Sequence, residues 1–493
     1  MEPVIGAHSR DPLARNDGER TAETSPVIAR RYCAEAIQSF CVRCTEEAAF
    51  DQCLRHLFLF SVPDADSPNP SDNVKDTMTE ALQTTVAAPK SVAGSTAAPV
   101  KRVYPLPSRL PTQQGPNGIR FDFNDGFRIL VPESNRPWKI RLSDLDTGLV
   151  LFETDVRAGG IRSNQRYYAR YRVEVWQQGE SILVHDYSAG DREVLVQIPV
   201  GTLGDPIGWL PYAVKFKERH GCKLTCAMGE KLIAIFRDAY PDVTFLTHDE
   251  VNTERYYASY SIGLFFDDKA AISQPRDFRQ VGLHRTAGYI LGVDPTETRP
   301  RLTFENDTRP IAEPYVCISV QSTTQSKYWN NPDGWRSVVA FVKEAGYRVV
   351  CIDQKAVHGH GLTWNHIPHG AEDETGDKPL AERIRTLRHA AFFIGLSSGL
   401  SWLAWAVDIP VVMISGFTHP INEFHTPYRV INFGACNSCW NDPRIKFDHY
   451  DFLYCPRHKD TPRQFECTRL ITADQVKAAI QSIPGFGVHG RQI

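Results

Sequence analysis

The alternation of apolar and polar positions is clearest between residues 118 and 187. Segments such as YRVEV change from apolar to polar at every residue, as half-buried antiparallel strands do. Turn-forming residues interrupt the alternation at Asn124-Asp125-Gly126, Asp146-Thr147-Gly148 and Gln178-Gly179. We therefore predict a small antiparallel β domain over residues 117–192.

From residue 193 onward the pattern changes to short apolar, β-branched runs separated by amphipathic segments. This alternation predicts doubly wound parallel sheets, one in residues 193–312 and a second in residues 313–493. A Pro- and Thr-rich stretch, residues 292–314, connects the two units. The apolar runs include VLVQI (194–198), CKLTCAM (222–228), VTFL (243–246), YVCISV (315–320), YRVVCI (347–352), AAFFI (390–394) and IPVVMI (409–414).

Two N-terminal stretches lack this organisation. Residues 1–62 form a cysteine-containing segment in which residues 28–60 have a helical composition, and residues 63–116 are rich in Pro, Ser and Thr and predict a disordered linker. The N-terminal cysteines fit either a metal site or a cysteine-rich helix, because only one CxxC pair is present. They are Cys33, Cys41, Cys44 and Cys53.

Composition narrows the functional class. The chain of 493 residues carries a net charge of -3, which gives no general attraction for nucleic acid or an anionic membrane. No apolar run approaches the roughly 20 residues that span a bilayer, and the first residues lack a signal-peptide core. We expect a cytoplasmic protein. In a reducing compartment, its clustered cysteines indicate metal binding, whereas the isolated ones are expected in the core (Cys222, Cys226, Cys317 and Cys351).

A glycine-rich turn, Gly201-Thr202-Leu203-Gly204-Asp205, follows the run at 194–198. The apolar positions after it, up to Phe216, fall on one face of a helix. This order places Asp205 at the carboxyl end of a parallel strand, where open α/β sheets bind their ligands. Asp205 is therefore either a general base or an acid that caps the first turn of the helix.

Two further turns follow predicted strands: QSTTQSK, residues 321–327, and GLSSGLS, residues 395–401. Small residues at the start of a helix allow backbone N–H groups to bind an anion, and Lys327 adds a positive charge. The chain has neither a P-loop motif nor a G-x-G-x-x-G after a strand, which argues against a P-loop kinase and a dinucleotide dehydrogenase. The three turns together favour a diphosphate-sugar site in an interdomain cleft.

The late cysteines form the most specific motif. Cys436, Cys439, Cys455 and Cys467 lie in a polar stretch with little periodicity, and four thiolates suit tetrahedral zinc or iron. We expect a metal finger over residues 434–470, with His449 and His458 as alternative ligands. A closed four-thiolate shell leaves no open coordination position, so the metal is expected to be structural.

The residues also resemble a known family. VGTLGDPIGWLP (200–211) resembles the glycine–Asp turn of the lipopolysaccharide heptosyltransferases, and LSSGLSWLAWA (396–406) is similar to their diphosphate loop, with Trp402 in place of a histidine. QSTTQSKYWNNPDGW (321–335) and the cysteine finger are more similar to the bacterial autotransporter heptosyltransferases. The resemblance extends from about Gly118 to the C-terminus.

This resemblance implies an α/β fold with a GT-B-like pair of Rossmann-like domains, the first binding the acceptor and the second the nucleotide sugar. It implies transfer of heptose from ADP-heptose to serine hydroxyls of an autotransporter adhesin passenger. It also implies a homo-oligomer, a dodecamer, with one ferric iron per chain on the four late cysteines and no metal required for catalysis.

By the same resemblance, Asp205 is the general base and Lys327 neutralises the departing diphosphate. Thr202 and Leu203 shape the acceptor side through their backbone. The full donor and diphosphate set comprises Lys327, Thr202, Leu203, Gly204, Ser398, Gly399, Leu400 and Ser401. Two alternatives remain: a non-catalytic assembly scaffold stabilised by its metal, and a heptosyltransferase acting on lipopolysaccharide. Asp122 and Asp125 fit turn positions, and they are the next candidates for the base.

Overall fold

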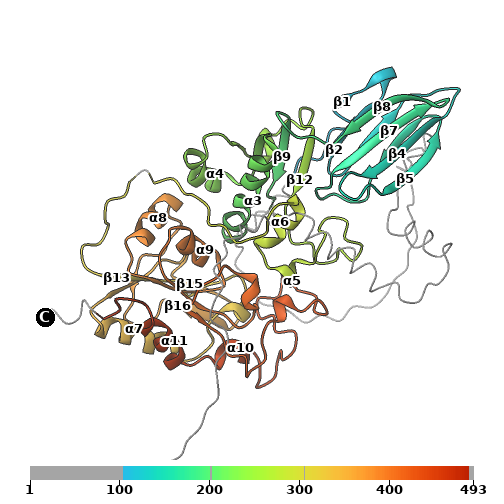
Figure 1. Ribbon diagram of the computed structural model, residues 1–493. Helices are drawn as coiled ribbons and strands as arrows, with labels where there is room; N and C mark the ends of the chain where they lie inside the picture. Colours follow the sequence, from blue (N-terminus) through green and yellow to red (C-terminus); the bar gives the residue numbers. More distant parts are fainter. Residues whose placement is uncertain (1–103, 200–201, 305, 488–493) are drawn as a thin grey trace, which may run out of the picture. The chain divides into compact units, whose positions relative to one another are not determined.

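A computed structural model describes residues 104–199, 202–304 and 306–487 (Figure 1). The helical segment predicted over residues 1–62, its four cysteines and most of the predicted linker lie outside these described residues. Among the helices of the described part, none is both long enough and apolar enough to cross a membrane.

The last part of the predicted linker is ordered, which corrects the expectation for residues 104–116. The Thr112 N–H donates to the Asp122 carboxylate (3.0 Å), and β1 (Gln113–Gln114) pairs antiparallel with β2 (Arg120–Asn124). The Pro105 carbonyl accepts from the Gln197 side chain (3.2 Å). Polar and proline-rich residues can be held by backbone hydrogen bonds without an apolar face of their own, which composition does not reveal.

The predicted antiparallel strands form a four-stranded sheet in the order β5-β4-β7-β8. Its alternating residues are buried, as the sequence pattern requires. The predicted Gln178-Gly179 break is a two-residue turn with both residues at positive φ (54° and 82°), which suits the twist of a hairpin. The strands are β4 (Trp138–Asp144), β5 (Val150–Val156), β7 (Tyr171–Gln177) and β8 (Glu180–Asp186).

A second sheet runs across the domain boundary expected near residue 193. Its order is β11-β10-β9-β12-β2-β3-β6, with β1 also paired to β2. β9 (Glu193–Gln197) is parallel to both neighbours, and β12 (Ala258–Ser261) pairs in parallel with β2. The sheet of the first α/β unit therefore also contains strands from residues before 193. The other strands are β3 (Arg128–Val131), β6 (Gly159–Arg162), β10 (Lys223–Ala227) and β11 (Thr244–Leu246).

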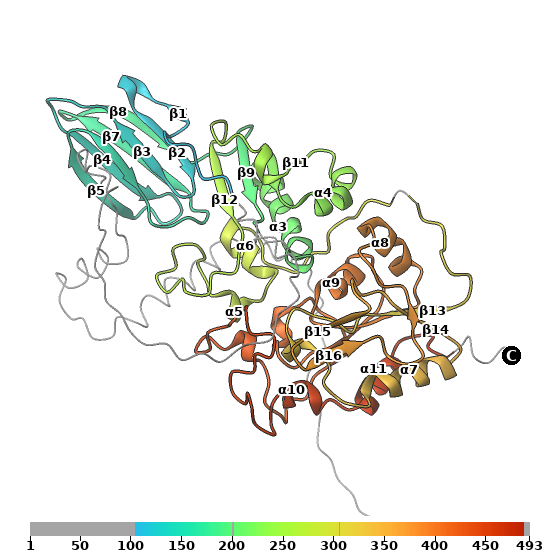
Figure 2. The same cartoon turned by 180° about the vertical axis from the view of Figure 1, so that it is seen from behind.

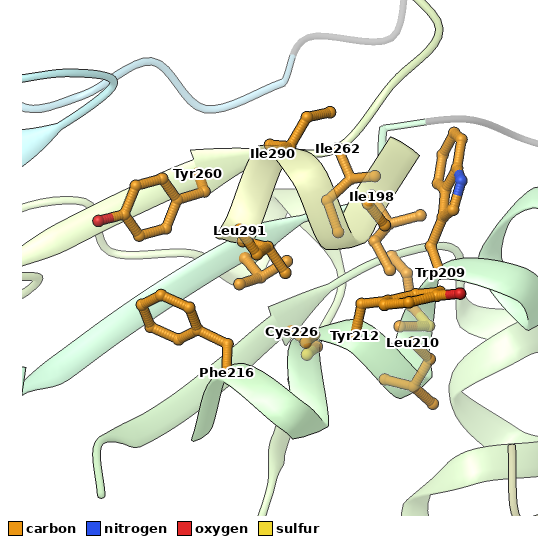
Figure 3. Close-up of a cluster of buried hydrophobic side chains, with 14 of the residues drawn as sticks. Ile198, Trp209, Leu210, Tyr212, Phe216, Cys226, Tyr260, Ile262, Ile290 and Leu291 are labelled. Atoms are coloured by element: carbon orange, nitrogen blue, oxygen red, sulfur yellow. The ribbon is translucent and has the colours of Figure 1, made fainter. Parts of the chain in front are cut away.

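Helix α3 (Gly204–His220) follows β9 and forms despite two prolines. Pro206 lies in the first turn, where backbone N–H groups have no partner within the helix, while Pro211 lies in the interior. Burial offsets this cost, because all residues from Pro206 to Ala213 are buried, so this part of α3 is enclosed on every side and not on the single face that was predicted. In Figure 3, side chains of α3 pack with residues of the sheet and of α6 (Arg285–Leu291). The cluster includes Ile198, Trp209, Leu210, Tyr212, Phe216, Cys226, Tyr260, Ile262, Ile290 and Leu291.

The third sheet is entirely parallel, in the order β17-β14-β13-β18-β19-β20. Helices α7 and α11 lie on one side of it and α8 and α9 on the other (Figures 1 and 2). Its strands are β13 (Tyr315–Ile318), β14 (Arg348–Cys351), β17 (Glu372–Asp373), β18 (Phe393–Leu396), β19 (Val411–Ile414) and β20 (Arg429–Val430). The helices are α7 (Gly334–Glu344), α8 (Leu380–Arg388), α9 (Gly399–Ala406) and α11 (Ala473–Gln481).

The second and third sheets each contain a point at which the order of their parallel strands reverses, and ligands of α/β proteins bind at such points. In the second sheet β9 lies between β10 and β12, and in the third sheet β13 lies between β14 and β18. Loops after such strands diverge in opposite directions and leave room for a ligand at the carboxyl edge. The turn at 201–205 follows β9, residues 321–327 follow β13, and residues 397–401 follow β18.

Shorter elements complete the described part, among them a hairpin of β15 (Val357–His360) and β16 (Thr363–His366) that the pattern analysis did not predict. The short helices are α4 (Glu230–Phe236), α5 (Phe278–Val281) and α10 (Glu466–Arg469). The 3-10 turns are η1 (Pro116–Gly118), η2 (Arg237–Ala239), η3 (His248–Glu250), η4 (Gln325–Lys327), η5 (Pro420–Asn422) and η6 (Cys439–Asn441). The four isolated cysteines are buried, as expected.

Candidate active site and metal centre

Asp205 lies in the first turn of α3, directly after the carboxyl end of β9. Its carboxylate accepts a hydrogen bond from the Thr202 hydroxyl. Burial raises the pKa of Asp205 above its ordinary value, and the hydrogen bond and the charge of Lys327 oppose that rise. Gly201, the first glycine of the predicted turn, lies outside the described residues.

Lys327 ends the short turn η4 after β13. Burial lowers the pKa of its ammonium group, while the negative charges of Asp205 and Glu423 raise it. Asp205 and Lys327 thus act on each other electrostatically although they come from different sheets. Opposite charges that are partly removed from water interact more strongly than they do at a surface.

The third predicted turn lies at the N-terminus of α9, and Ser398 is the N-cap residue of this helix. Among the described residues, the Ser398 hydroxyl oxygen is buried without a hydrogen-bond partner. A helix N-terminus with an unpaired hydroxyl is suited to an anion. Leu400 packs at the edge of the core. The Ser401 hydroxyl instead donates to the Leu396 carbonyl (2.5 Å), so its side chain stabilises the turn from within.

Trp402 occupies the position at which the resembled diphosphate loop has a histidine, and its contacts explain this difference. A Cβ added at Gly204 would lie 2.7 Å from its ring, and one at Gly208 would lie 3.0 Å from it. The buried indole thus fits against the glycine face of α3 and contacts the His284 ring at 5.4 Å between centroids. Its function in this structure is packing between α9 and α3.

Glu423 is a buried site residue that the sequence patterns did not identify. Its carboxylate accepts from the Ser397 hydroxyl (2.5 Å) and from the Arg429 guanidinium (2.8 Å). The side chain has no exposed surface, and its charge acts on Lys327. It lies after η5 in an irregular loop, where neither periodicity nor a motif marks a buried acid.

The two alternative candidates for the general base form ion pairs with arginines. Asp122 is fully buried and pairs with Arg128 (2.6 Å), and Asp125 occupies a turn beside Arg162 and Arg166. Asp122 lies in β2 and Asp125 in the turn between β2 and β3, so both stabilise the antiparallel part of the second sheet. The structure therefore favours the turn interpretation for Asp125 and corrects it for Asp122, which is a buried residue of β2 paired with β3.

The four late cysteines influence one another's pKa values. The pKa of Cys439 is raised to about 12 by burial and by Cys436 and Cys455, and burial together with all three neighbours raises that of Cys467. Buried sulfur atoms that repel one another as thiolates are the donor set that a bound zinc or iron ion stabilises. The chemistry of these side chains suits a metal held through sulfur, but among the described residues the four sulfur atoms do not form a group whose members all lie within 4.8 Å of one another, so the four-cysteine site stays a prediction.

A second donor set overlaps the first. Cys436, His458 and Glu466 each offer one ligand atom, and the three atoms lie within 4.8 Å of one another. Glu466 is also held by Arg463 (2.6 Å). The alternative ligand His458 is thus adjacent to Cys436, whereas the His449 ring packs against the Phe447 ring at 4.5 Å.

Comparisons with known proteins identify the family of the chain. Residues 115–179 match the N-terminal domain of glycosyltransferase TibC, and residues 284–447 match glycosyltransferase family 9 (heptosyltransferase). The autotransporter heptosyltransferase BAHTCr of Citrobacter rodentium is 53% identical over 379 residues, which cover 76% of this chain and 92% of the relative. An inactive autotransporter heptosyltransferase, BimC of Burkholderia thailandensis, is 46% identical over 387 residues, covering 78% and 90%.

A solved structure shows the same fold. The autotransporter heptosyltransferase TibC of Escherichia coli is described as a dodecameric, iron-containing enzyme in complex with ADP-D-beta-D-heptose. It superimposes with a TM-score of 0.73 at 53% identity, covering 76% of this chain and 98% of TibC. On this evidence the chain belongs to the autotransporter heptosyltransferases, and it is a glycosyltransferase of the family 9 type.

Proposed function

We propose that this protein transfers heptose from ADP-heptose to serine hydroxyls of an autotransporter adhesin passenger. The observation that carries the proposal is the close contact of Gly399, at the start of α9, with Leu203 and Gly204. This contact puts the first turn of α3, with Asp205, beside that helix end, and the charge of Lys327 acts on Asp205. A general base and a positive charge meet there with a helix end suited to phosphate. A non-catalytic scaffold has no need of that combination.

Asp205 acts on the acceptor side of the reaction. Its carboxylate takes the proton from the serine hydroxyl as that oxygen attacks the anomeric carbon of heptose. The bond between this carbon and the diphosphate oxygen breaks, and ADP leaves with the bonding electrons. Because burial raises the pKa of Asp205, its carboxylate is a stronger base than an exposed aspartate.

Lys327 and the start of α9 act on the leaving group. The ammonium of Lys327 neutralises the charge that develops on the diphosphate, and the Ser398 hydroxyl and the backbone at Gly399 bind its oxygens. Thr202, Leu203 and Gly204 hold the Asp205 carboxylate next to the turn at the start of α9. These groups supply the positive charge that departure requires, so the proposal assigns no catalytic role to a metal.

The cysteine finger, residues 434–470, holds one structural metal in this proposal. Cys436, Cys439, Cys455 and Cys467 would bind ferric iron, with zinc as the alternative, and His458 and Glu466 lie beside them. The iron assignment is supported by the description of TibC as iron-containing. Because TibC is also described as dodecameric, we infer a dodecamer of this chain, acting in the bacterial cytoplasm on passengers before their export.

One experiment tests the proposal. The purified protein is incubated with ADP-heptose and an adhesin passenger, and intact mass and peptide mapping report the sugar and its site. A heptose increment on passenger serines is expected. No increment on the passenger, with transfer to a lipopolysaccharide core, would replace the acceptor class. Transfer to neither acceptor would support the scaffold, and the relative BimC is itself described as inactive.

A further inference from the structure

The cysteine finger contacts the segment that carries Lys327 at several points. The Phe452 carbonyl accepts from the Gln325 N–H (2.8 Å) and from the Thr324 hydroxyl (2.9 Å). The Asn330 side chain donates to the Thr468 hydroxyl (2.8 Å). The segment after β13 is thus fastened to the finger both before and after Lys327.

Trp440 makes the contact closest to the chemistry. The Lys327 ammonium lies 4.8 Å from the centroid of the Trp440 ring, within the distance of a cation–π interaction. The indole N–H donates to the Asn422 side chain (3.0 Å), and Asn422 directly precedes Glu423. Trp440 therefore links Lys327 to the loop that carries the buried carboxylate acting on it.

The position of Trp440 is fixed from two directions. Its indole packs among the rings of Phe266 and Phe278 from the first α/β unit, at 5.5 and 6.2 Å between centroids. In the chain it directly follows Cys439, and Thr468 directly follows Cys467. Two of the proposed metal ligands are therefore each one residue away from a group that holds the Lys327 segment.

We propose that Trp440 is a positioning residue for Lys327, and that the cysteine finger through it forms part of the donor site. The indole face holds the ammonium group where it meets the diphosphate of the donor. This role goes beyond stabilising an assembly. The inference rests on the proposed function, because it treats Lys327 as a ligand of that diphosphate.

The test compares Trp440→Leu, which removes the ring, with Trp440→Phe, which keeps a ring face but loses the N–H donor. Trp176→Leu is the matched control, because Arg141 lies 5.1 Å over that ring on the antiparallel sheet. Calorimetry with ADP, steady-state kinetics and elemental analysis are run on the full-length, metal-containing protein.

We expect Trp440→Leu to keep its metal, to bind ADP about 5–30-fold more weakly and to raise the donor KM more than it lowers kcat. Trp440→Phe should stay within about threefold of wild type, and Trp176→Leu should not change. In a Lys327→Ala background, Trp440→Leu should add less than about twofold, because its effect passes through that lysine.

Each contrary result has a definite meaning. The inference is wrong if Trp440→Leu binds ADP like wild type, loses its metal, or weakens ADP binding equally in the Lys327→Ala background. It is also wrong if Trp440→Phe is as impaired as Trp440→Leu, because the hydrogen bond and not the ring face would then matter. Unchanged ADP affinity in Lys327→Ala alone would instead overturn the role of Lys327 in the proposed function.

Discussion

Gly399 at the start of α9 lies directly against Leu203 at the start of α3. A Cβ on Gly399 would lie 2.7 Å from the Leu203 Cβ and 3.3 Å from the Gly204 nitrogen. The beginnings of two helices that follow strands of different sheets therefore touch. The helix end proposed for the diphosphate is thereby beside the carboxylate proposed as the base.

Gly399→Ala should disturb this contact. The added methyl group meets the Cβ of Leu203 and the backbone of Gly204, so α9 and α3 must move apart at about 1–3 kcal/mol of stability. We expect turnover to fall by about tenfold or more. Gly229→Ala is the control, because a Cβ there meets nothing within 4 Å. Equal turnover in the two variants would show that the close contact has no catalytic importance.

Asp205→Asn should retain the fold and bind ADP while transfer falls by about 10²–10⁴-fold, since the amide cannot accept the serine proton. Transfer is measured by mass spectrometry with ADP-heptose and passenger. Asp125→Asn serves as a comparison, because Asp125 is paired with Arg162. Rapid transfer by Asp205→Asn would exclude Asp205 as the base.

The pH dependence of kcat/KM should be bell-shaped. Asp205 must be ionised, and because burial raises its pKa, activity should be lost on acidification at a pH above the ordinary 3.8. Lys327 must be charged, and because burial lowers its pKa, activity should be lost on the alkaline side below 10.5. In Lys327→Arg the alkaline loss should move upward. An alkaline limb unmoved by that substitution would belong to another group.

Truncation should distinguish the two parts of the predicted linker. Deleting residues 1–103 leaves every described contact in place, so activity and thermal stability should be retained. Deleting residues 1–115 removes β1 and the Thr112 N–H that donates to the buried Asp122. Asp122 keeps Arg128 and Asn124 as partners, so the cost is that of the hydrogen bonds lost with this segment, about 0.5–1.5 kcal/mol each, and this protein should melt several degrees lower. Identical melting curves would contradict an ordered role for residues 104–115.

Cys439→Ser should lose the metal and the order of the cysteine finger, as in other small units folded by a metal. The wild-type protein should be coloured by thiolate-to-iron charge transfer, and the variant should be colourless. Because Trp440 is the next residue, ADP affinity should fall together with any loss of assembly. Elemental analysis, calorimetry and light scattering are the measurements. Full metal content with an unchanged oligomer would disprove the ligand assignment.

The sequence by itself determined the local elements and the nature of the groups. The run at 194–198 corresponds to β9, and the helical segment predicted after the glycine turn corresponds to α3. Periodicity also indicated the antiparallel strands and their turns, because burial of alternate residues is a property of a single strand. The family resemblance, based on short motifs, is confirmed by relatives at 53% identity.

The tertiary structure decided what depends on residues far apart in the chain. It paired β2 with β12 in the second sheet and ordered residues 104–116. It directed the Ser401 hydroxyl to the Leu396 carbonyl. It also brought Glu423 and Trp440 to Lys327, although neither belongs to a recognisable motif. Local patterns report the periodic burial of one element, whereas a buried charge or a ring beneath an ammonium depends on which loops the strand order brings together.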